Sequence, residues 1–257
     1  EGLVAAGNIF MGMTESPVLI KNYLPTMNRS EIFLVMVSGM GTIAGSVMGT
    51  YIGMLGGTDP AAKVLFATHL LSASVMAVPG SIVLAKMLCP QTEEASDHVA
   101  ISGKEKENSN ILDAISSGTV TGVKLMTNIA AMLLVFISLV ALANYITEGV
   151  IGRYTGLNDW IVKITDGKAQ GLTFQFILGV ITSPFMWLIG VPSQDIMLVG
   201  SLLGQKTILN EFVAYFQLQQ WKDAGLFMYE KSILMSTYIL CGFANISSIG
   251  ILLGGLG

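Results

Sequence analysis

Two carboxylates stand where the sequence is otherwise apolar. Glu15 lies within the apolar run at residues 9–20, and Glu211 lies within a second such run at residues 207–215. A charged side chain inside hydrocarbon is costly, so an acid in such a place is by default a candidate functional residue. A carboxylate that accepts two hydroxyl hydrogens of a ligand makes strong charge-assisted hydrogen bonds. These two acids are therefore the first candidates for a polar binding site.

Each acid is followed along the chain by an apolar helix that small and polar residues interrupt. The first interruption covers residues 38–46, and the second covers residues 241–248. A short broken segment that carries a carboxylate, followed by a discontinuous helix, thus occurs twice. Paired broken segments of this kind are typical of transporters built from two structural repeats, in which the substrate binds between the repeats. The sequence therefore predicts an inverted-repeat transporter.

Composition supports a membrane protein. The chain is 52% hydrophobic and 12% charged, with mean hydropathy +0.67, whereas soluble domains are about 25% charged. Several apolar segments approach or exceed the roughly 20 residues that cross a bilayer, namely residues 31–55, 64–88, 128–146 and 233–257. We predict an all-α polytopic membrane protein with two re-entrant helical hairpins and two discontinuous transmembrane helices.

Other functional classes lack their signatures. The net charge is −4 without a basic patch, which argues against nucleic-acid binding. Cys89 and Cys241 form no disulfide or metal pattern. We find no nucleophile–base or metal constellation, so we predict that the protein is not an enzyme and has no cofactor.

The predicted organisation is a single transporter core over residues 1–257, divided into five parts. Residues 1–24 form the first re-entrant hairpin, and residues 31–88 form the first broken helix and the next span. Residues 110–146 hold an interfacial helix (110–127) and a scaffold span. Residues 172–218 hold an interfacial segment, broken at Ser183-Pro184, and the second hairpin. Residues 233–257 form the second broken helix.

The polar groups of the two hairpins and of the second broken helix favour a neutral ligand. They are hydroxyl, amide and carboxylate groups, contributed by Thr14, Glu15, Asn210, Glu211, Asn245, Ser247 and Ser248. Such groups suit a ligand rich in hydroxyls and ring nitrogens, such as a sugar or a nucleoside. No arginine lies near them in sequence, which disfavours a phosphorylated or carboxylated substrate. For Glu211 the alternative is a structural ion pair with Lys206.

A second cluster could bind a small cation. Asn8 and Thr42 supply side-chain oxygens, and the broken backbone around Met11 and Ile43 supplies carbonyls. Unwound carbonyls and half-helix ends coordinate Na⁺ in transporters. The alternative for Asn8 and Thr42 is a hydrogen bond to a neighbouring helix or to their own backbone. Phe243 could either stack on a base or pack in the core.

Four motifs carry a resemblance to a known family. Residues 8–17, 44–47, 209–215 and 241–249 closely resemble the concentrative nucleoside transporters. The resemblance implies eight transmembrane helices, two re-entrant hairpins and a homotrimer in the plasma membrane. It also implies that this chain is an internal fragment, which begins within the first hairpin and lacks three preceding helices and the final one.

The same resemblance implies residue roles. The positions that match nucleobase contacts are Met13, Thr14, Glu15 and Val47. Those that match the ribose site are Glu211, Asn245 and Ser248, with Phe243 as a nearby aromatic. Those that match the sodium site are Asn8, Met11, Thr42 and Ile43, with Met11 and Ile43 acting through backbone carbonyls. Many family members have Gln where this chain has Met13, and this difference favours purine nucleosides.

The predicted function is a cation-coupled nucleoside symporter, with sodium as the coupling ion, that works by alternating access and prefers purines. Coupling to protons through Glu15 or Glu211 is the first alternative. A channel-like pore is the second, although channels present rings of like groups around an axis, whereas the two hairpin tips here differ.

Overall fold

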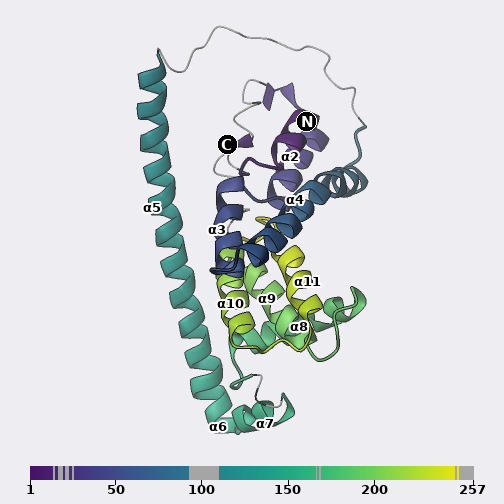
Figure 1. The fold of residues 1–257 in the computed structure, drawn as a ribbon, viewed down its shortest axis with the longest axis vertical. Helices are drawn as coiled ribbons and strands as arrows, with labels where there is room; N and C mark the ends of the chain where they lie inside the picture. The colour runs from purple at the N-terminus through teal and green to yellow at the C-terminus, as the bar shows by residue number, and fades with distance from the viewer. Residues whose placement is uncertain are drawn as a thin grey trace. The chain divides into compact units, whose positions relative to one another are not determined.

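The computed structural model describes residues 1–13, 15–16, 20, 23–24, 26–92, 110–165, 167, 169–246 and 248. Within these ranges the regular elements are all helices (Figure 1). The chain divides into two compact units. Unit 1 holds Glu1–His98 and Gln175–Gly257, and unit 2 holds Val99–Phe174. Each unit is described by itself.

The described α-helices in the N-terminal half of unit 1 are α1 (Gly2–Gly7), α2 (Arg29–Gly41), α3 (Gly45–Gly56) and α4 (Pro60–Leu88). Local sequence fixes where two of them begin. Asn28 and Glu31 form a reciprocal capping box at the start of α2. Asp59 accepts hydrogen bonds from two backbone N–H groups of α4, whose first residue is a proline. Between α2 and α3 the helix unwinds at residues 42–44, as the sequence predicts.

The described C-terminal half of unit 1 holds α8 (Phe174–Leu188), α9 (Ile196–Ile208), α10 (Glu211–Asp223) and α11 (Glu230–Leu240). The chain breaks at Leu209 and Asn210, and the Asn210 side chain caps α10. Helix α11 ends at Leu240, and a non-helical segment follows it to Asn245. Of the second broken helix at 233–257, residue 247 and residues 249–257 lie outside the described residues.

The core of unit 1 joins the two halves. Its buried members come from the first break and from α3, α4, α9, α10 and α11, and include Ile43, Tyr51, Leu55, Phe66, Leu70, Leu202, Tyr215, Leu218 and Leu240. The rings of Tyr51 on α3 and Tyr215 on α10 stack with centroids 4.0 Å apart. His69 on α4 and the hydroxyl of Tyr238 on α11 lie 2.9 Å apart. The two repeats therefore share one core.

In the part of the chain that the structure describes, two helical stretches are long and apolar enough to cross a membrane, Arg29–Gly56 and Pro60–Leu88. The predicted break at Ser183-Pro184 is wrong, because α8 continues through Pro184. The hydroxyls of Thr182 and Ser183 donate to the carbonyls of Leu178 (2.9 Å) and Gly179 (2.6 Å).

Unit 2 also departs from the prediction. The interfacial helix at 110–127 and the span at 128–146 form one helix, α5 (Ile111–Asn144). No proline interrupts this segment, and an isolated glycine such as Gly118 weakens a helix without ending it. A π-helix (Tyr145–Gly152) and two short helices, α6 (Arg153–Thr155) and α7 (Leu157–Ile164), complete unit 2.

Asp195 ties α9 to the segment that leads into α11. The side chain is fully buried. Its two carboxylate oxygens accept from the backbone N–H groups of Met228 (3.0 Å) and Tyr229 (3.1 Å). Asp195 is the N-cap residue of α9, but its side chain makes no capping hydrogen bond there. Asp195 instead fixes the start of α9 against a segment more than thirty residues later.

We therefore expect Asp195→Asn to destabilise the protein. The amide leaves one backbone N–H without an acceptor and removes the charge from the other hydrogen bond. A buried donor left unpaired costs about 1–3 kcal/mol. The measurement is the thermal unfolding midpoint of the full-length protein in detergent. Asp223→Asn is the matched control, since that side chain is 59% exposed. Equal midpoints for the two variants would show that Asp195 does not hold these segments together.

Candidate functional site

The two broken helices meet at their breaks. The N–H of Phe243 donates to the carbonyl of Thr42 over 3.3 Å. Gly242 has φ +105°, and a Cβ added there would lie 2.7 Å from the carbonyl oxygen of Gly41. Only glycine allows both this backbone conformation and this close approach. The unwound segments that the sequence places far apart are thus in contact.

Glu211 lies beside the second break. It is the first residue of α10, and it is 7% exposed. The amide of Asn245 donates to its Oε2 over 2.8 Å, and the hydroxyl of Tyr51 lies 3.5 Å from its Oε1. The Oδ1 atom of Asn245 accepts from the N–H of Ser248 over 2.8 Å. The structure therefore brings together Glu211, Asn245 and Ser248, the three residues predicted to hold a ribose.

Tyr51 belongs to this cluster, although it is not among the site residues predicted from the sequence. It is fully buried on α3 and stacks on Tyr215. One feature of the sequence points to Tyr51. A tyrosine in an apolar helix needs a hydrogen-bond partner for its hydroxyl group, and Glu211 is a carboxylate in need of donors.

The first hairpin and the first break are joined through Ser38. Asn8 is fully buried. Its amide donates to the hydroxyl of Ser38 over 2.9 Å, and its Oδ1 accepts from the hydroxyl of Ser16. The Thr42 hydroxyl donates to the carbonyl of Ser38 over 3.1 Å. Asn8 thus bonds a neighbouring helix and Thr42 bonds its own backbone, which is the alternative to a cation site that the sequence left open. Both bonds end on Ser38, so the two side chains lie around one turn of α2.

The backbone near the first break is also joined to the hairpin. The N–H of Gly45 at the start of α3 donates to the carbonyl of Phe10 over 2.9 Å. Met11 directly follows Phe10 and is half-buried, and Ile43 is fully buried between α2 and α3. The four residues predicted to bind sodium therefore lie on two segments that are hydrogen-bonded to each other.

The residues predicted to contact the nucleobase differ from one another in burial. Met13 is buried, and a Cβ added to Gly39 would lie 3.3 Å from its Cβ. Glu15 is exposed, and its carboxylate accepts from the N–H of Gly12 over 3.0 Å. Val47 and Phe243 pack against the core cluster. Thr14 lies outside the described residues.

Lys206 is a buried cation near the second break. It lies in the last turn of α9 and is 5% exposed. Its Nζ donates to the carbonyls of Ile239 (2.9 Å) and Cys241 (3.2 Å), at the end of α11. Among the described residues, Lys206 and Glu211 do not form an ion pair. The structural ion pair considered from the sequence is therefore not seen. Lys206 is bound to backbone carbonyls instead.

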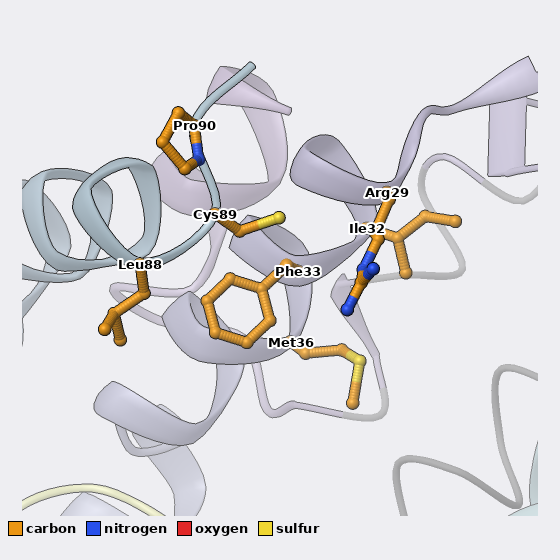
Figure 2. A pocket seen from close by; sticks show the side chains of 7 residues that line it. All are labelled: Arg29, Ile32, Phe33, Met36, Leu88, Cys89 and Pro90. Carbon is orange, nitrogen blue, oxygen red and sulfur yellow. The ribbon is translucent and has the colours of Figure 1, made fainter. Parts of the chain in front are cut away.

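A pocket of about 710 Å³ lies between the start of α2 and the end of α4. Figure 2 shows its lining side chains, Arg29, Ile32, Phe33, Met36, Leu88, Cys89 and Pro90. None of these residues belongs to the predicted substrate or sodium sites, so the pocket is separate from the two breaks.

Comparison with known proteins adds to this geometry. A family model for the C-terminus of Na⁺ dependent nucleoside transporters matches residues 69–257. An uncharacterized transporter of Haemophilus influenzae is 39% identical over 260 residues, which cover 100% of this chain and 57% of that protein. Sodium/nucleoside cotransporter 2 of Rattus norvegicus is 39% identical over 270 residues, covering 100% of this chain and 38% of that protein.

Solved structures agree with these relatives. CNTnw in an inward-facing substrate-bound state matches with a TM-score of 0.79 and 37% identity over 98% of this chain and 55% of that one. A variant of the same protein in an intermediate state matches with a TM-score of 0.81, also at 37% identity, over 98% of this chain and 56% of that one. The chain thus spans 57% of the length of the Haemophilus influenzae transporter and 38% of the length of the Rattus norvegicus cotransporter.

The fold prediction is confirmed by this likeness: the chain is an all-α membrane protein of inverted repeats, with two re-entrant hairpins and two discontinuous helices. The relatives are transporters and the matched family is one of transporters, not of enzymes. Because the family model matches most of its length, the chain belongs to the family of Na⁺-dependent nucleoside transporters.

Proposed function

We propose that the full-length protein is a sodium-coupled nucleoside symporter of the plasma membrane that works by alternating access as a homotrimer. The observation that carries the proposal is the buried cluster of Glu211, Asn245 and Ser248, where a carboxylate is held at the second break by an amide and a helix end. Na⁺-dependent relatives cover the whole chain, and related structures in inward-facing and intermediate states support alternating access.

Glu211 has the acceptor capacity that a sugar requires. An ionised carboxylate offers about four lone-pair sites. Asn245 takes one of them, and the long contact to Tyr51 occupies a second only weakly. Two ribose hydroxyls can therefore donate to the remaining positions. The first residues of α10 add the positive end of a helix dipole, which stabilises the carboxylate without a bound substrate.

The nucleobase is expected to lie toward the first hairpin tip. Met13 offers a polarizable apolar surface there, and Val47 and Phe243 provide further apolar contact near the breaks. Thr14 and Glu15 complete this set in the proposal. A thioether makes dispersion contacts with a large ring and no strong hydrogen bond, so the proposed preference is for purine nucleosides.

Sodium is proposed to bind between the first hairpin and the end of α2. The ligands are the side-chain oxygens of Asn8 and Thr42 and the backbone carbonyls of Met11 and Ile43. The carbonyl end of α2 carries the negative end of its dipole, which attracts a cation. Ser38 donates no oxygen to the ion in this proposal; it holds the Asn8 amide in place through its hydroxyl.

Glu211→Gln should weaken the uptake of every nucleoside. The variant retains the shape of the side chain but loses the charge that strengthens two hydrogen bonds. A hydrogen bond to a charged group contributes about 1.5–3 kcal/mol, so the half-saturating concentration should rise roughly tenfold to a hundredfold. The measurement is concentration-dependent uptake of labelled uridine and adenosine. Glu230→Gln, an exposed acid at the start of α11, is the control. Normal uptake by Glu211→Gln would disprove the ribose assignment.

Thr42→Ala should raise the Na⁺ concentration that half-maximal uptake requires, because the ion loses one oxygen ligand. Thr42→Ser retains the hydroxyl and should behave as the wild type does. Uptake of labelled nucleoside is measured while Na⁺ is replaced stepwise by choline. Undiminished wild-type uptake without Na⁺, driven by a pH gradient, would establish proton coupling instead.

Met13→Gln should improve pyrimidine uptake relative to purine uptake, because the amide can pair with the polar edge of a pyrimidine. An edge left unpaired on binding costs about 1–3 kcal/mol. The readout is competition of labelled uridine by unlabelled adenosine and cytidine. Met13→Leu is the matched control, since it retains the apolar packing against Gly39. If the ratio of the two competitors is the same in all three proteins, Met13 only packs the hairpin tip.

A further inference from the structure

We propose that the pocket between the start of α2 and the end of α4 binds an anionic phospholipid, whose phosphate group pairs with Arg29 and whose acyl chain lies along the apolar lining. The pocket is separate from both breaks, so the inference does not rest on the proposed transport function. It assigns a lipid ligand to a surface outside the substrate and sodium sites.

The pocket lies at the level of the lipid headgroups. The two stretches that are long and apolar enough to cross a membrane, Arg29–Gly56 and Pro60–Leu88, are joined by residues 57–59 alone. Because each stretch has the length of a bilayer crossing and the connection is this short, the chain crosses the membrane and returns. The start of the first stretch and the end of the second therefore lie at the same membrane surface, and these two ends line the pocket.

The lining combines apolar side chains with one cation. Its apolar members are Ile32, Phe33, Met36, Leu88 and Pro90. Figure 2 shows the Phe33 ring between the side chains of Leu88 and Arg29. The volume of about 710 Å³ falls within the range of about 300–1,000 Å³ that is typical of small-molecule sites. An apolar cavity beside an exposed cation suits an amphiphile with an anionic head and a hydrocarbon chain.

Arg29 carries a charge that the described residues do not neutralise. Among them, its guanidinium forms neither an ion pair nor a side-chain hydrogen bond. The nearby carboxylate of Glu31 accepts instead from the backbone N–H of Asn28. The other cation at this surface, Lys86, is already paired with Glu1 over 2.8 Å. A guanidinium presents a planar fork of N–H donors that matches a phosphate bidentately, so Arg29 is the group that can hold the headgroup.

The two helix ends that line the pocket are tied together without a ligand. The hydroxyl of Ser30 donates to the carbonyl of Cys89 over 2.7 Å. The Nζ atom of Lys86 donates to the Ser30 hydroxyl over 3.1 Å and to the side chain of Gln91 over 3.0 Å. A site that is already held in place loses less conformational freedom when a ligand binds. These bonds therefore favour a stable pocket at this surface.

The first test measures lipid binding to the full-length protein, purified and delipidated in detergent. Phosphatidylglycerol and phosphatidylcholine with the same acyl chains are titrated, and bound lipid is counted by native mass spectrometry. We expect phosphatidylglycerol to bind more tightly, because the choline ammonium offsets the phosphate charge. Arg29→Gln should weaken phosphatidylglycerol binding roughly tenfold, because a charge-assisted hydrogen bond is lost.

Arg153→Gln is the matched control, since Arg153 is the other arginine of the chain and is exposed on α6. It should bind phosphatidylglycerol as the wild type does. Equal affinities in the wild type and Arg29→Gln would overturn the inference. Inorganic phosphate should not displace the lipid, because it has no hydrocarbon chain. Displacement by an equal concentration of phosphate would identify free phosphate as the ligand and overturn the lipid assignment.

The second test follows the pocket itself through Cys89, a free cysteine in its lining. The full-length protein is placed in phosphatidylcholine nanodiscs with or without phosphatidylglycerol, and maleimide modification of Cys89 is followed by peptide mass spectrometry. We expect phosphatidylglycerol to slow the modification several-fold in the wild type. It should not do so in Arg29→Gln, which controls for the surface charge of the membrane.

Three results of this second test would contradict the proposal. An unchanged rate in the wild type would show that the lipid does not enter the pocket. Equal slowing in the wild type and Arg29→Gln would be an effect of the membrane surface alone. Absence of modification in every bilayer would show that another segment of the full-length protein covers the pocket. Neither test measures transport, so a failure of the proposed function would leave both results interpretable.

Discussion

A helix that stops inside an apolar region must find new partners for its last carbonyls and first N–H groups, and the site depends on this constraint. An unsatisfied backbone group in hydrocarbon costs several kcal/mol. In this chain the breaks satisfy one another. Gly45 donates to Phe10 of the hairpin, Phe243 of the second break donates to Thr42 of the first, and Lys206 donates to the end of α11. A break in one segment is stable only because another segment is adjacent.

The polar cluster and the apolar core are consequently linked. Tyr51 stacks on Tyr215 in the core, while its hydroxyl reaches toward Glu211. Tyr215 in turn donates to the carbonyl of Thr237 on α11 over 2.8 Å. The orientation of the Glu211 carboxylate is therefore set by packing between α3, α10 and α11 as well as by Asn245. A substitution of Tyr51 or Tyr215 would therefore also change the position of the Glu211 carboxylate.

The sequence predicts the breaks well and their partners poorly. Small and polar residues in apolar runs place the two breaks within residues 38–46 and 241–248, and the structure is non-helical at 42–44 and 241–245. The same contrast identifies Glu211 and Asn245. The partners of Lys206 and Asp195 are backbone groups over thirty residues away. A backbone group leaves no signature in the side-chain sequence, so such contacts cannot be read from composition or spacing. The prediction divides residues 110–146 into an interfacial helix and a span, because Asp113 and Lys124 lie among small and apolar residues. The structure instead has one continuous helix, Ile111–Asn144.

The two hairpin carboxylates, Glu15 and Glu211, differ in burial and in how firmly they are held. Glu211 is buried and is held by Asn245 and by the start of α10, so its position is fixed before any ligand arrives. Glu15 is exposed, and its bond to Gly12 stays within its own hairpin tip. A fixed buried carboxylate suits the part of a ligand that never varies, because its hydrogen bonds are already oriented. An exposed tip can adjust at small cost. In the proposed transporter, affinity for the sugar therefore belongs to the second hairpin, and the choice among bases belongs to the first.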